Sequence, residues 1–223
     1  MGTGPRRLGV LTVGQAPRDD VTPTLRAVLG ESVLLRESGA LDGLTEEGLA
    51  DLAPRDSETP LETRLSGGAP VLVAEERLVP LLRAAAERLA RSCDLTLLLC
   101  SGEFPTLAES HIGVVQPVHL LRGAVAALCH DRVLGIVGPA SDMEGAPRRW
   151  GCCAGAVITS AASPYGRDGE VGAAVDDLAE RGAQLVFLND MAFTAEHRAA
   201  ASSAGLPVLC ATTVVAHVLK DVL

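Results

Sequence analysis

The chain has 223 residues, which suits one large α/β unit or two lobes of about 100 residues each. Hydrophobic residues make up 48% and charged residues 21%, a balance that excludes a disordered chain. The net charge is −9, aromatic residues make up only 2%, and Lys220 is the one lysine, so a nucleic-acid-binding surface is not expected.

Short apolar runs predict strands, and amphipathic stretches between them predict helices. The runs cover residues 8–13, 33–35, 71–73, 95–99, 133–137, 156–159, 185–188 and 207–209. Continuous apolar runs are typical of strands buried on both faces of a parallel sheet. Helical spacing covers residues 77–91, 118–128, 171–178, 194–204 and 213–223, with Gly182 as a C-cap. This alternation predicts an α/β fold of mostly parallel sheet flanked by helices.

A weak internal repeat predicts two pseudo-symmetric lobes. Residues 7–14 resemble residues 132–138, and residues 97–104 resemble residues 186–193. The expected lobes are residues 1–114 and 115–223, and the C-terminal helix could cross over from one lobe to the other. The alternative is a chance likeness between two ordinary βα units.

Polar or glycine-rich turns follow four of the predicted strands, at residues 14–18, 100–103, 138–141 and 189–190. Ligands of parallel α/β sheets bind at the carboxyl ends of the strands, where helix N-termini favour anions. The hydroxyl of Thr12 and the guanidinium of Arg18 suit a carboxylate. The turns therefore predict a site for a small carboxylate.

Cys100 is the most informative residue of these turns, because it ends an apolar strand and precedes Ser-Gly. An accessible thiol at such a place, with a helix beginning beyond it, favours the thiolate and would serve as an acid/base or a nucleophile. The alternative is a buried cysteine that packs as a small apolar side chain. Glu103 is either a second titratable group or a partner of a helix dipole.

The remaining cysteines and histidines argue against a metal site. None of the six cysteines forms a C-x-x-C pair, and the histidines lack metal-binding spacing. The adjacent Cys152 and Cys153 are either a redox element or two small core or loop residues. Nucleotide-binding glycine motifs are missing. No apolar run could span a bilayer and the N-terminal run is too short for a signal peptide, so we expect a cytoplasmic protein without membrane contact.

Several segments resemble the AroM family. They are residues 8–18, 39–44, 97–105, 162–165 and 207–209, which together span almost the whole chain. The resemblance places the chain near the aspartate/glutamate/hydantoin racemase superfamily, which includes maleate isomerases and arylmalonate decarboxylases. It implies two pseudo-symmetric lobes, a small-acid site between them, a cysteine from each lobe, and neither a metal nor an organic cofactor.

By this resemblance Cys100 matches the first-lobe cysteine, and Asp190 stands where the second is expected. A carboxyl could replace one thiol, or Cys100 could act alone, as in a decarboxylase. The expected substrate-binding residues are Thr12, Gly14, Gln15, Arg18, Ser101, Gly102, Glu103, Ser163 and Tyr165. The resulting hypothesis is a cofactor-independent enzyme acting alpha to the carboxylate of a small acid. The alternative is a small-acid-binding regulatory protein without turnover, and the sequence leaves a homodimer open.

Overall fold

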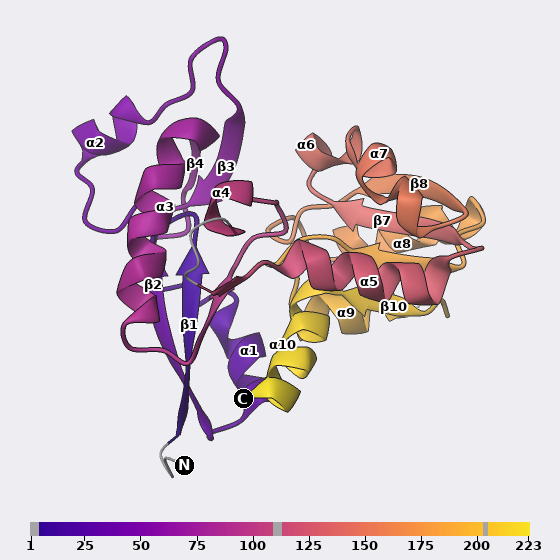
Figure 1. The fold of residues 1–223 in the computed structure, drawn as a ribbon. Coiled ribbons are helices and arrows are strands. Elements are labelled where there is room, and N and C mark those ends of the chain that lie inside the picture. Colours follow the sequence, from indigo (N-terminus) through magenta and orange to yellow (C-terminus); the bar gives the residue numbers. More distant parts are fainter. Residues whose placement is uncertain (1–4, 109–112, 203–204) are drawn as a thin grey trace. The chain divides into compact units, whose positions relative to one another are not determined.

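The computed structural model describes residues 5–108, 113–202 and 205–223, and the chain divides into two compact units. The first unit draws on residues 1–22 and 30–116 together with Leu223, and the second on residues 23–29 and 117–222. Each unit holds one parallel sheet (Figure 1). The segment 23–29 of the first helix therefore belongs to the second unit.

The first unit is built on a four-stranded parallel sheet in the order β2-β1-β5-β6, beside a separate two-stranded sheet. Its strands are β1 (Arg6–Thr12), β2 (Val33–Gly39), β3 (Pro60–Arg64), β4 (Pro70–Ala74), β5 (Leu95–Leu98) and β6 (Val114–Val115). Its helices are α2 (Glu46–Asp51), α3 (Glu75–Ala90) and α4 (Pro105–Ala108), and α1 (Thr22–Leu29) joins β1 to β2 in the chain.

Residues 71–73 form a strand but not a strand of the parallel sheet. They lie in β4, which pairs antiparallel with β3, and Leu61 of β3 faces Val73 of β4. The interpretation of this run as a strand buried on both faces of the parallel sheet is therefore wrong. The physical reason is visible in the exposure, because Leu72 is 52% exposed while Val73 is fully buried. A strand covered on one face alternates in this way.

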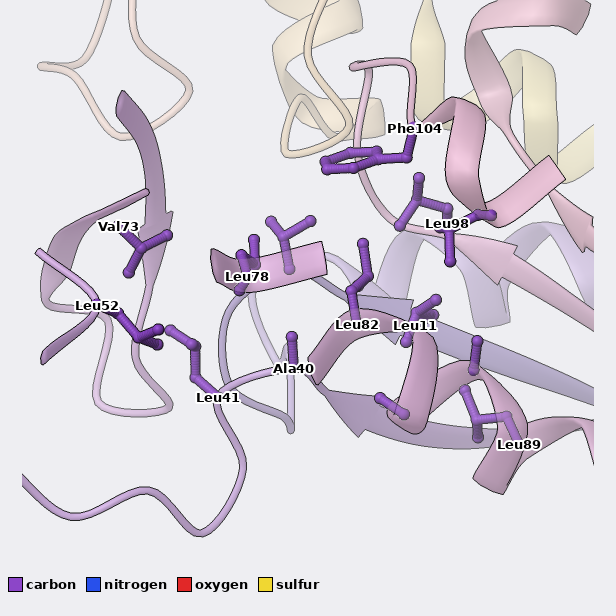
Figure 2. Close-up of a cluster of buried hydrophobic side chains, with 14 residues drawn as sticks. Leu11, Ala40, Leu41, Leu52, Val73, Leu78, Leu82, Leu89, Leu98 and Phe104 are labelled. Carbon is purple, nitrogen blue, oxygen red and sulfur yellow. The ribbon is translucent and has the colours of Figure 1, made fainter. Parts of the chain in front are cut away.

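Helix α3 contributes more buried residues to the core of the first unit than any other element. Its leucines at helical spacing contact β1 and β5 on one face of the sheet, and Val73 and Leu52 extend the same cluster toward the β3–β4 hairpin (Figure 2). Gly9 of β1 lets the helix approach closely, since a Cβ there would lie 3.1 Å from Cβ of Leu89. Packing of this kind buries apolar surface and fixes the strand ends that follow.

The second unit has a parallel sheet in the order β8-β7-β9-β10. Its strands are β7 (Val133–Gly138), β8 (Ala156–Ala161), β9 (Leu185–Leu188) and β10 (Val208–Cys210). Its helices are α5 (Pro117–Cys129), α6 (Ala140–Met143), α7 (Ala146–Trp150), the 3-10 turn η1 (Gly151–Cys153), α8 (Glu170–Glu180), α9 (Ala195–Ala201) and α10 (Ala211–Val222). Gly182 follows α8 with φ of +88°, as expected of a residue beyond a helix end.

Helices cover both faces of this second sheet (Figure 1). Val186 and Leu188 of β9 join a cluster with α8 and α9, whereas the ring of Phe187 meets that of Trp150 in α7 at 4.9 Å, edge to face. Neighbouring strand residues point to opposite faces, so α7 lies on the face opposite α8. This explains why residues 185–188 read as an unbroken apolar run.

The two sheets are copies of one plan, which confirms the predicted pseudo-symmetry. The order β2-β1-β5-β6 matches β8-β7-β9-β10, and Leu11 pairs with Leu98 as Val137 pairs with Leu188. The correspondence extends to packing. Gly135 faces Leu178 of α8, with a Cβ placed there lying 3.3 Å from Cβ of that leucine, much as Gly9 faces α3.

Several predicted boundaries shift. Strand β2 continues past Leu35 to Gly39, α9 ends at Ala201, and the last helix begins at Ala211 rather than at residue 213. Part of the predicted helix over 194–204 lies outside the described residues. Among the residues that the structure describes, no helix has both the length and the apolar character needed to cross a membrane.

Candidate functional site

Cys100 lies just past the carboxyl end of β5, where the polypeptide leaves the first sheet. The N–H of Leu99 donates to the carbonyl of Leu11 at 2.7 Å, which extends the pairing of β5 with β1 by one residue. Cys100 therefore begins the loop at the edge where β1 and β2 also end. Its side chain is half-buried, as suits a thiol that is held in place yet within reach of a small molecule.

The thiol of Cys100 has a backbone donor. The N–H of Gly102 lies 3.3 Å from Sγ of Cys100. An amide donor at this distance can stabilise a thiolate, the nucleophilic form of cysteine. The helix expected beyond Cys100 begins only at Pro105, so the donor is this amide rather than a helix N-terminus. The sequence could suggest the thiol, but not which group would face it.

The loop after Cys100 is fixed by a buried glutamine. The side chain of Gln116 accepts the N–H of Phe104 at 2.8 Å and donates to the carbonyl of Phe104 at 3.1 Å. The ring of Phe104 is buried in the core of the first unit. Ser101 is half-buried and Glu103 is exposed on this loop. The segment from Cys100 to Phe104 is thus tethered at both ends.

Arg18 and Thr12, each expected from the sequence to offer a group to a carboxylate, are hydrogen-bonded to each other. The guanidinium of Arg18 donates to Oγ1 of Thr12 at 3.2 Å. It also donates through Nε and Nη2 to both carboxylate oxygens of Asp20, at 2.9 and 2.8 Å. The guanidinium of Arg18 therefore already binds a carboxylate of the same unit with two parallel hydrogen bonds, and Arg18 is only 8% exposed. Asp20 was not singled out from the sequence, although it lies two residues from Arg18.

Gly14 and Gln15 hold the β3–β4 hairpin against the sheet edge. The N–H of Gln15 donates to the carbonyl of Arg64 at 3.0 Å, and its Oε1 accepts the N–H of Ser66 at 3.0 Å. A Cβ on Gly14 would collide with the Arg64 carbonyl and would lie 2.6 Å from Oγ1 of Thr63. Gly14 is therefore required by a close backbone approach.

Asp42, in the turn that follows β2, holds the same turn after β1 through its carboxylate. Its carboxylate accepts the N–H of Gly39 at 2.7 Å and the N–H of Ala16 at 2.8 Å. Ala16 precedes Pro17 through a cis peptide bond. Sequence reasoning missed this role of Asp42, although the Asp-Gly pair at 42–43 is a turn signal. The turn after β1 is thus bound to both neighbouring segments.

Asp190 occupies in the second unit the position that Cys100 occupies in the first. It lies two residues after Leu188, and the N–H of Asn189 donates to the carbonyl of Val137 at 2.8 Å, as Leu99 does to Leu11. The N–H of Ala192 donates to Oδ1 of Asp190 at 2.7 Å. In both units the side chain at this position accepts the amide two residues further on.

Asn189 is a feature that sequence reasoning did not single out. Its side chain is fully buried, and in the described part of the chain neither Oδ1 nor Nδ2 has a hydrogen-bond partner. The corresponding residue of the first unit is the apolar Leu99. A buried amide without partners is costly, so its presence beside Asp190 requires an explanation.

Ser163 and Tyr165 lie in the turn that follows β8. The N–H of Ser163 donates to Oε1 of Glu170 at 3.1 Å, and Oγ of Ser163 accepts the N–H of Tyr165 at 3.1 Å. Tyr165 is 39% exposed. Glu170, at the start of α8, also accepts the N–H of Arg167 and was not predicted. The hydroxyl of Ser163 thus shapes the turn that carries Tyr165.

The predicted site residues fall into two sets, one at the carboxyl edge of each sheet. Thr12, Gly14, Gln15, Arg18 and residues 100–103 form the set of the first unit, and Ser163, Tyr165 and Asp190 form the set of the second. That both sets serve one ligand stays a prediction.

The six thiols differ in their surroundings. Burial raises the pKa of Cys129, Cys153 and Cys210. Cys93 and Cys100 are half-buried and Cys152 is exposed. Reagents that attack thiolates should therefore meet only Cys93, Cys100 and Cys152 readily.

A polar hollow in the first unit lies at the other end of the strands. It has a volume of about 430 Å³ and is lined by Pro5, Arg6, Arg7, Arg91, Ser92, Cys93 and Asp94. These residues precede or begin β1 and β5, so the hollow is at the amino edge of the sheet and not at Cys100.

Across residues 5–108, 113–202 and 205–223, no group of three or more His, Cys, Asp or Glu side chains is arranged to hold a metal ion.

Solved structures share this fold. Similar structures include an allantoin racemase from Pseudomonas fluorescens, with 13% identity over 97% of this chain and 90% of that chain and a TM-score of 0.56. A maleate isomerase from Pseudomonas putida matches with 11% identity over 97% and 92% and a TM-score of 0.58. A cysteine-to-serine mutant of the maleate cis-trans isomerase of Nocardia farcinica, with a covalently bound succinylcysteine intermediate, matches with 15% identity over 98% and 92% and a TM-score of 0.58.

These likenesses establish an aspartate/glutamate racemase-like fold of two pseudo-symmetric α/β lobes. A search of curated proteins finds no match to the sequence. The family model described as AroM protein matches residues 8–223, which include both sheets and both strand-end sets. The chain therefore belongs to the AroM family.

Proposed function

We propose that the protein is a cofactor-independent enzyme that acts at the carbon alpha to the carboxylate of a small acid. Cys100 serves as its acid/base or nucleophile, and Asp190 is the second ionisable group acting on the same substrate. The remaining residues of the two strand-end sets bind and orient that substrate. The observation that carries the proposal is the half-buried thiol of Cys100 with the Gly102 amide 3.3 Å from its sulfur.

The repeated frame supports a role for both strand ends. Cys100 and Asp190 follow equivalent strands, and each accepts the N–H of the residue two positions later. A pair of groups in equivalent frames suits chemistry in which one group removes a proton and the other returns it. Both side chains are partly buried, and Cys100 also packs against the core of the first unit, so each is held in place while part of it stays accessible.

The fold relatives support cysteine chemistry on small acids. The Nocardia farcinica maleate cis-trans isomerase mutant carries a succinylcysteine intermediate. A succinyl group on sulfur is what forms when a thiolate adds to the double bond of maleate. In this chain the candidate for such an addition is Cys100, which lies past the carboxyl end of β5, has an amide donor and is half-buried, whereas Cys210 at the end of β10 is fully buried.

Asp190 makes the proposed chemistry one-sided. Two thiols can exchange acid and base roles because their pKa values are close. An unperturbed carboxyl and an unperturbed thiol differ by about four to five pKa units, so they do not exchange roles evenly. We therefore expect isomerisation, decarboxylation or exchange at one face rather than efficient racemisation of aspartate, glutamate or hydantoins.

The test is proton exchange in deuterium oxide. The purified protein is incubated with separate enantiomers of amino, hydroxy and dicarboxylic acids and with maleate, and deuterium uptake and product chirality are measured. We expect uptake or conversion with at least one acid, lost in Cys100→Ala and strongly reduced in Asp190→Asn. Cys93→Ser is the matched control, because Cys93 is also half-buried but precedes β5 instead of following it.

Each outcome decides between the hypotheses. Anions that raise the melting temperature without any exchange or conversion would favour a small-acid-binding protein without turnover. Turnover that persists in Cys100→Ala would overturn the assigned role of the thiol. Rapid interconversion of both enantiomers, with equal deuterium uptake, would refute the one-sided model.

A further inference from the structure

Cys152 and Cys153 form a contact pair in the second unit, remote in sequence from both strand ends. They end the 3-10 turn η1, and their sulfur atoms lie 3.6 Å apart. Cys152 is exposed, whereas Cys153 is 5% exposed beneath it. A reagent in solution can therefore reach the sulfur of Cys152, while the sulfur of Cys153 lies buried within contact distance of it.

We propose that Cys152 and Cys153 are a reversible redox modification site, at which a peroxide converts the two thiols into a disulfide. The proposed activity at Cys100 has no use for this pair. The geometry assigns different parts to the two residues, with Cys152 as the thiol that reacts with the oxidant and Cys153 as the resolving thiol.

The chemistry balances with hydrogen peroxide as the oxidant. The thiolate of Cys152 attacks one peroxide oxygen, the O–O bond breaks, and the departing oxygen leaves as water after protonation. The sulfur of Cys152 is then a sulfenic acid. The sulfur of Cys153 displaces that hydroxyl, the S–O bond breaks, an S–S bond forms, and a second water leaves. Two thiols are oxidised and one peroxide is reduced to two waters.

The surroundings of Cys153 fit the resolving part. Burial and the neighbouring Cys152 raise the pKa of Cys153, while the charge of Arg122 in α5 opposes this effect. Cys153 is therefore a poor first site of oxidation, since the thiolate is the form of cysteine that reacts with peroxide. Once Cys152 is a sulfenic acid, the two sulfur atoms must close from 3.6 Å to a bond length of about 2.05 Å, which moves both side chains and strains the peptide between them.

The product should be readily reduced. Successive Cα atoms are about 3.8 Å apart across a trans peptide bond, below the usual range of about 4.4 to 6.8 Å between the Cα atoms of disulfide-linked cysteines. A strained disulfide on an accessible turn is of the labile kind that dithiols reopen. The pair is therefore suited to reversible oxidation rather than to permanent cross-linking.

Trp150 provides a spectroscopic signal for oxidation of the cysteine pair. Trp150, the one tryptophan of the chain, directly precedes η1 and stacks edge to face on Phe187. Cleavage after Arg149 and Arg167 by trypsin releases a peptide with Trp150, Cys152, Cys153 and Tyr165, and with no other cysteine. That peptide contains the one tryptophan and the one tyrosine, so its near-ultraviolet absorbance identifies it directly.

The experiment treats the full chain with equimolar hydrogen peroxide, alkylates the remaining thiols, and maps the tryptic peptides by mass spectrometry. We expect the 150–167 peptide to lose two hydrogen atoms, to lose alkylation at both cysteines, and to regain it after dithiothreitol. Tryptophan emission should change with the same time course. In Cys153→Ser, the sulfenic acid of Cys152 should persist and be captured by dimedone, and no intrapeptide disulfide should form.

Cys100→Ser is the control for competition between the two sites, and in it the oxidation of the pair should be unchanged. The proposal is overturned if the pair stays fully alkylatable while Cys93 or Cys100 oxidises. It is overturned equally if the 150–167 peptide is found joined to another peptide, or if Cys152 stops at a sulfenic acid although Cys153 is present.

Discussion

Removal of one amide hydrogen tests the thiol site directly. Gly102→Pro deletes the N–H that lies 3.3 Å from Sγ of Cys100 and leaves the thiol itself unchanged. Gly102→Ala is the matched control, because it keeps the N–H. Its added Cβ would lie 3.4 Å from Sγ and 3.6 Å from the ring of Phe104, which are ordinary contacts.

The expected loss of Cys100 reactivity can be estimated from the strength of a hydrogen bond to a charged acceptor, here the thiolate sulfur. A hydrogen bond to an ionised group is worth about 1.5 to 3 kcal/mol, which corresponds to roughly a ten- to 150-fold loss of thiolate at neutral pH. A more basic thiolate is also more nucleophilic, with a Brønsted slope of about 0.4 to 0.5. The remaining thiolate should therefore react about three- to tenfold faster, which offsets part of the loss. Alkylation of Cys100 near neutral pH should therefore slow by about three- to 15-fold.

The assay is the rate of iodoacetamide labelling of Cys100 against pH, read by peptide mapping. The Gly102→Pro profile should shift to higher pH and cross that of the unmodified protein, since its fully ionised thiolate reacts faster. Gly102→Ala should stay close to the unmodified profile, and Cys93 in the same samples should not change. Circular dichroism and thermal unfolding establish that both variants are folded. An unshifted Gly102→Pro profile in a folded protein would show that this amide does not support the thiolate.

Three further predictions follow from the two units. Gly9→Ala and Gly135→Ala should each lower the free energy of unfolding in urea by about 1 to 3 kcal/mol, since each new Cβ is forced against a leucine of α3 or α8, and a large loss in only one would contradict the equivalence. Burial raises the pKa of Cys210, so the folded chain keeps that proton longer than the unfolded chain. Stability present below about pH 9 should fall as the pH rises above it, less steeply in Cys210→Ala. Asp190→Cys restores a thiol beneath the Ala192 amide and should allow deuterium uptake from both enantiomers of a substrate, whereas unchanged one-sided exchange would argue against a shared site.

The central strands could be predicted from the sequence because they are buried on both faces. The runs at 95–99, 133–137 and 185–188 have apolar residues at every or nearly every position. The sheet registers make β1 and β7 equivalent, although they match Gly138 with Thr12 and not with Gly14. The edge strand β2 was read too short for the converse reason. Beyond Leu35 it continues through polar residues, because an edge strand with an exposed side needs no apolar run.

The hairpin β3–β4 was missed because half of it is polar. Strand β3 reads Pro-Leu-Glu-Thr-Arg, which shows no apolar run, and its partner was assigned to the wrong sheet. The available signal was the turn at residues 66–68, Ser-Gly-Gly, between two short β segments. Gln15 depended on this hairpin, since it bonds Arg64 and Ser66, so its bracing role was hidden as well.

The polar partners at the strand ends were harder to predict than the strand ends themselves. Asp42 binds the amide of Ala16 across 26 residues, and Gln116 fixes Phe104 across 12. Such contacts depend on where loops return in space, which hydrophobic periodicity does not report. Asp20 was closer, but only the folded turn brings its carboxylate to the guanidinium fork of Arg18.

The second strand end differs from the first at two neighbouring positions, and the difference is informative. Where the first unit has Leu99 and Cys100, the second has Asn189 and Asp190 in the same backbone frame. The buried amide of Asn189 lacks hydrogen-bond partners in the described structure, at a cost of about 1 to 3 kcal/mol that a leucine would not incur. Under the proposed function this difference has a reason, because Asn189 adds a buried polar group next to Asp190, at the strand end where the substrate is expected.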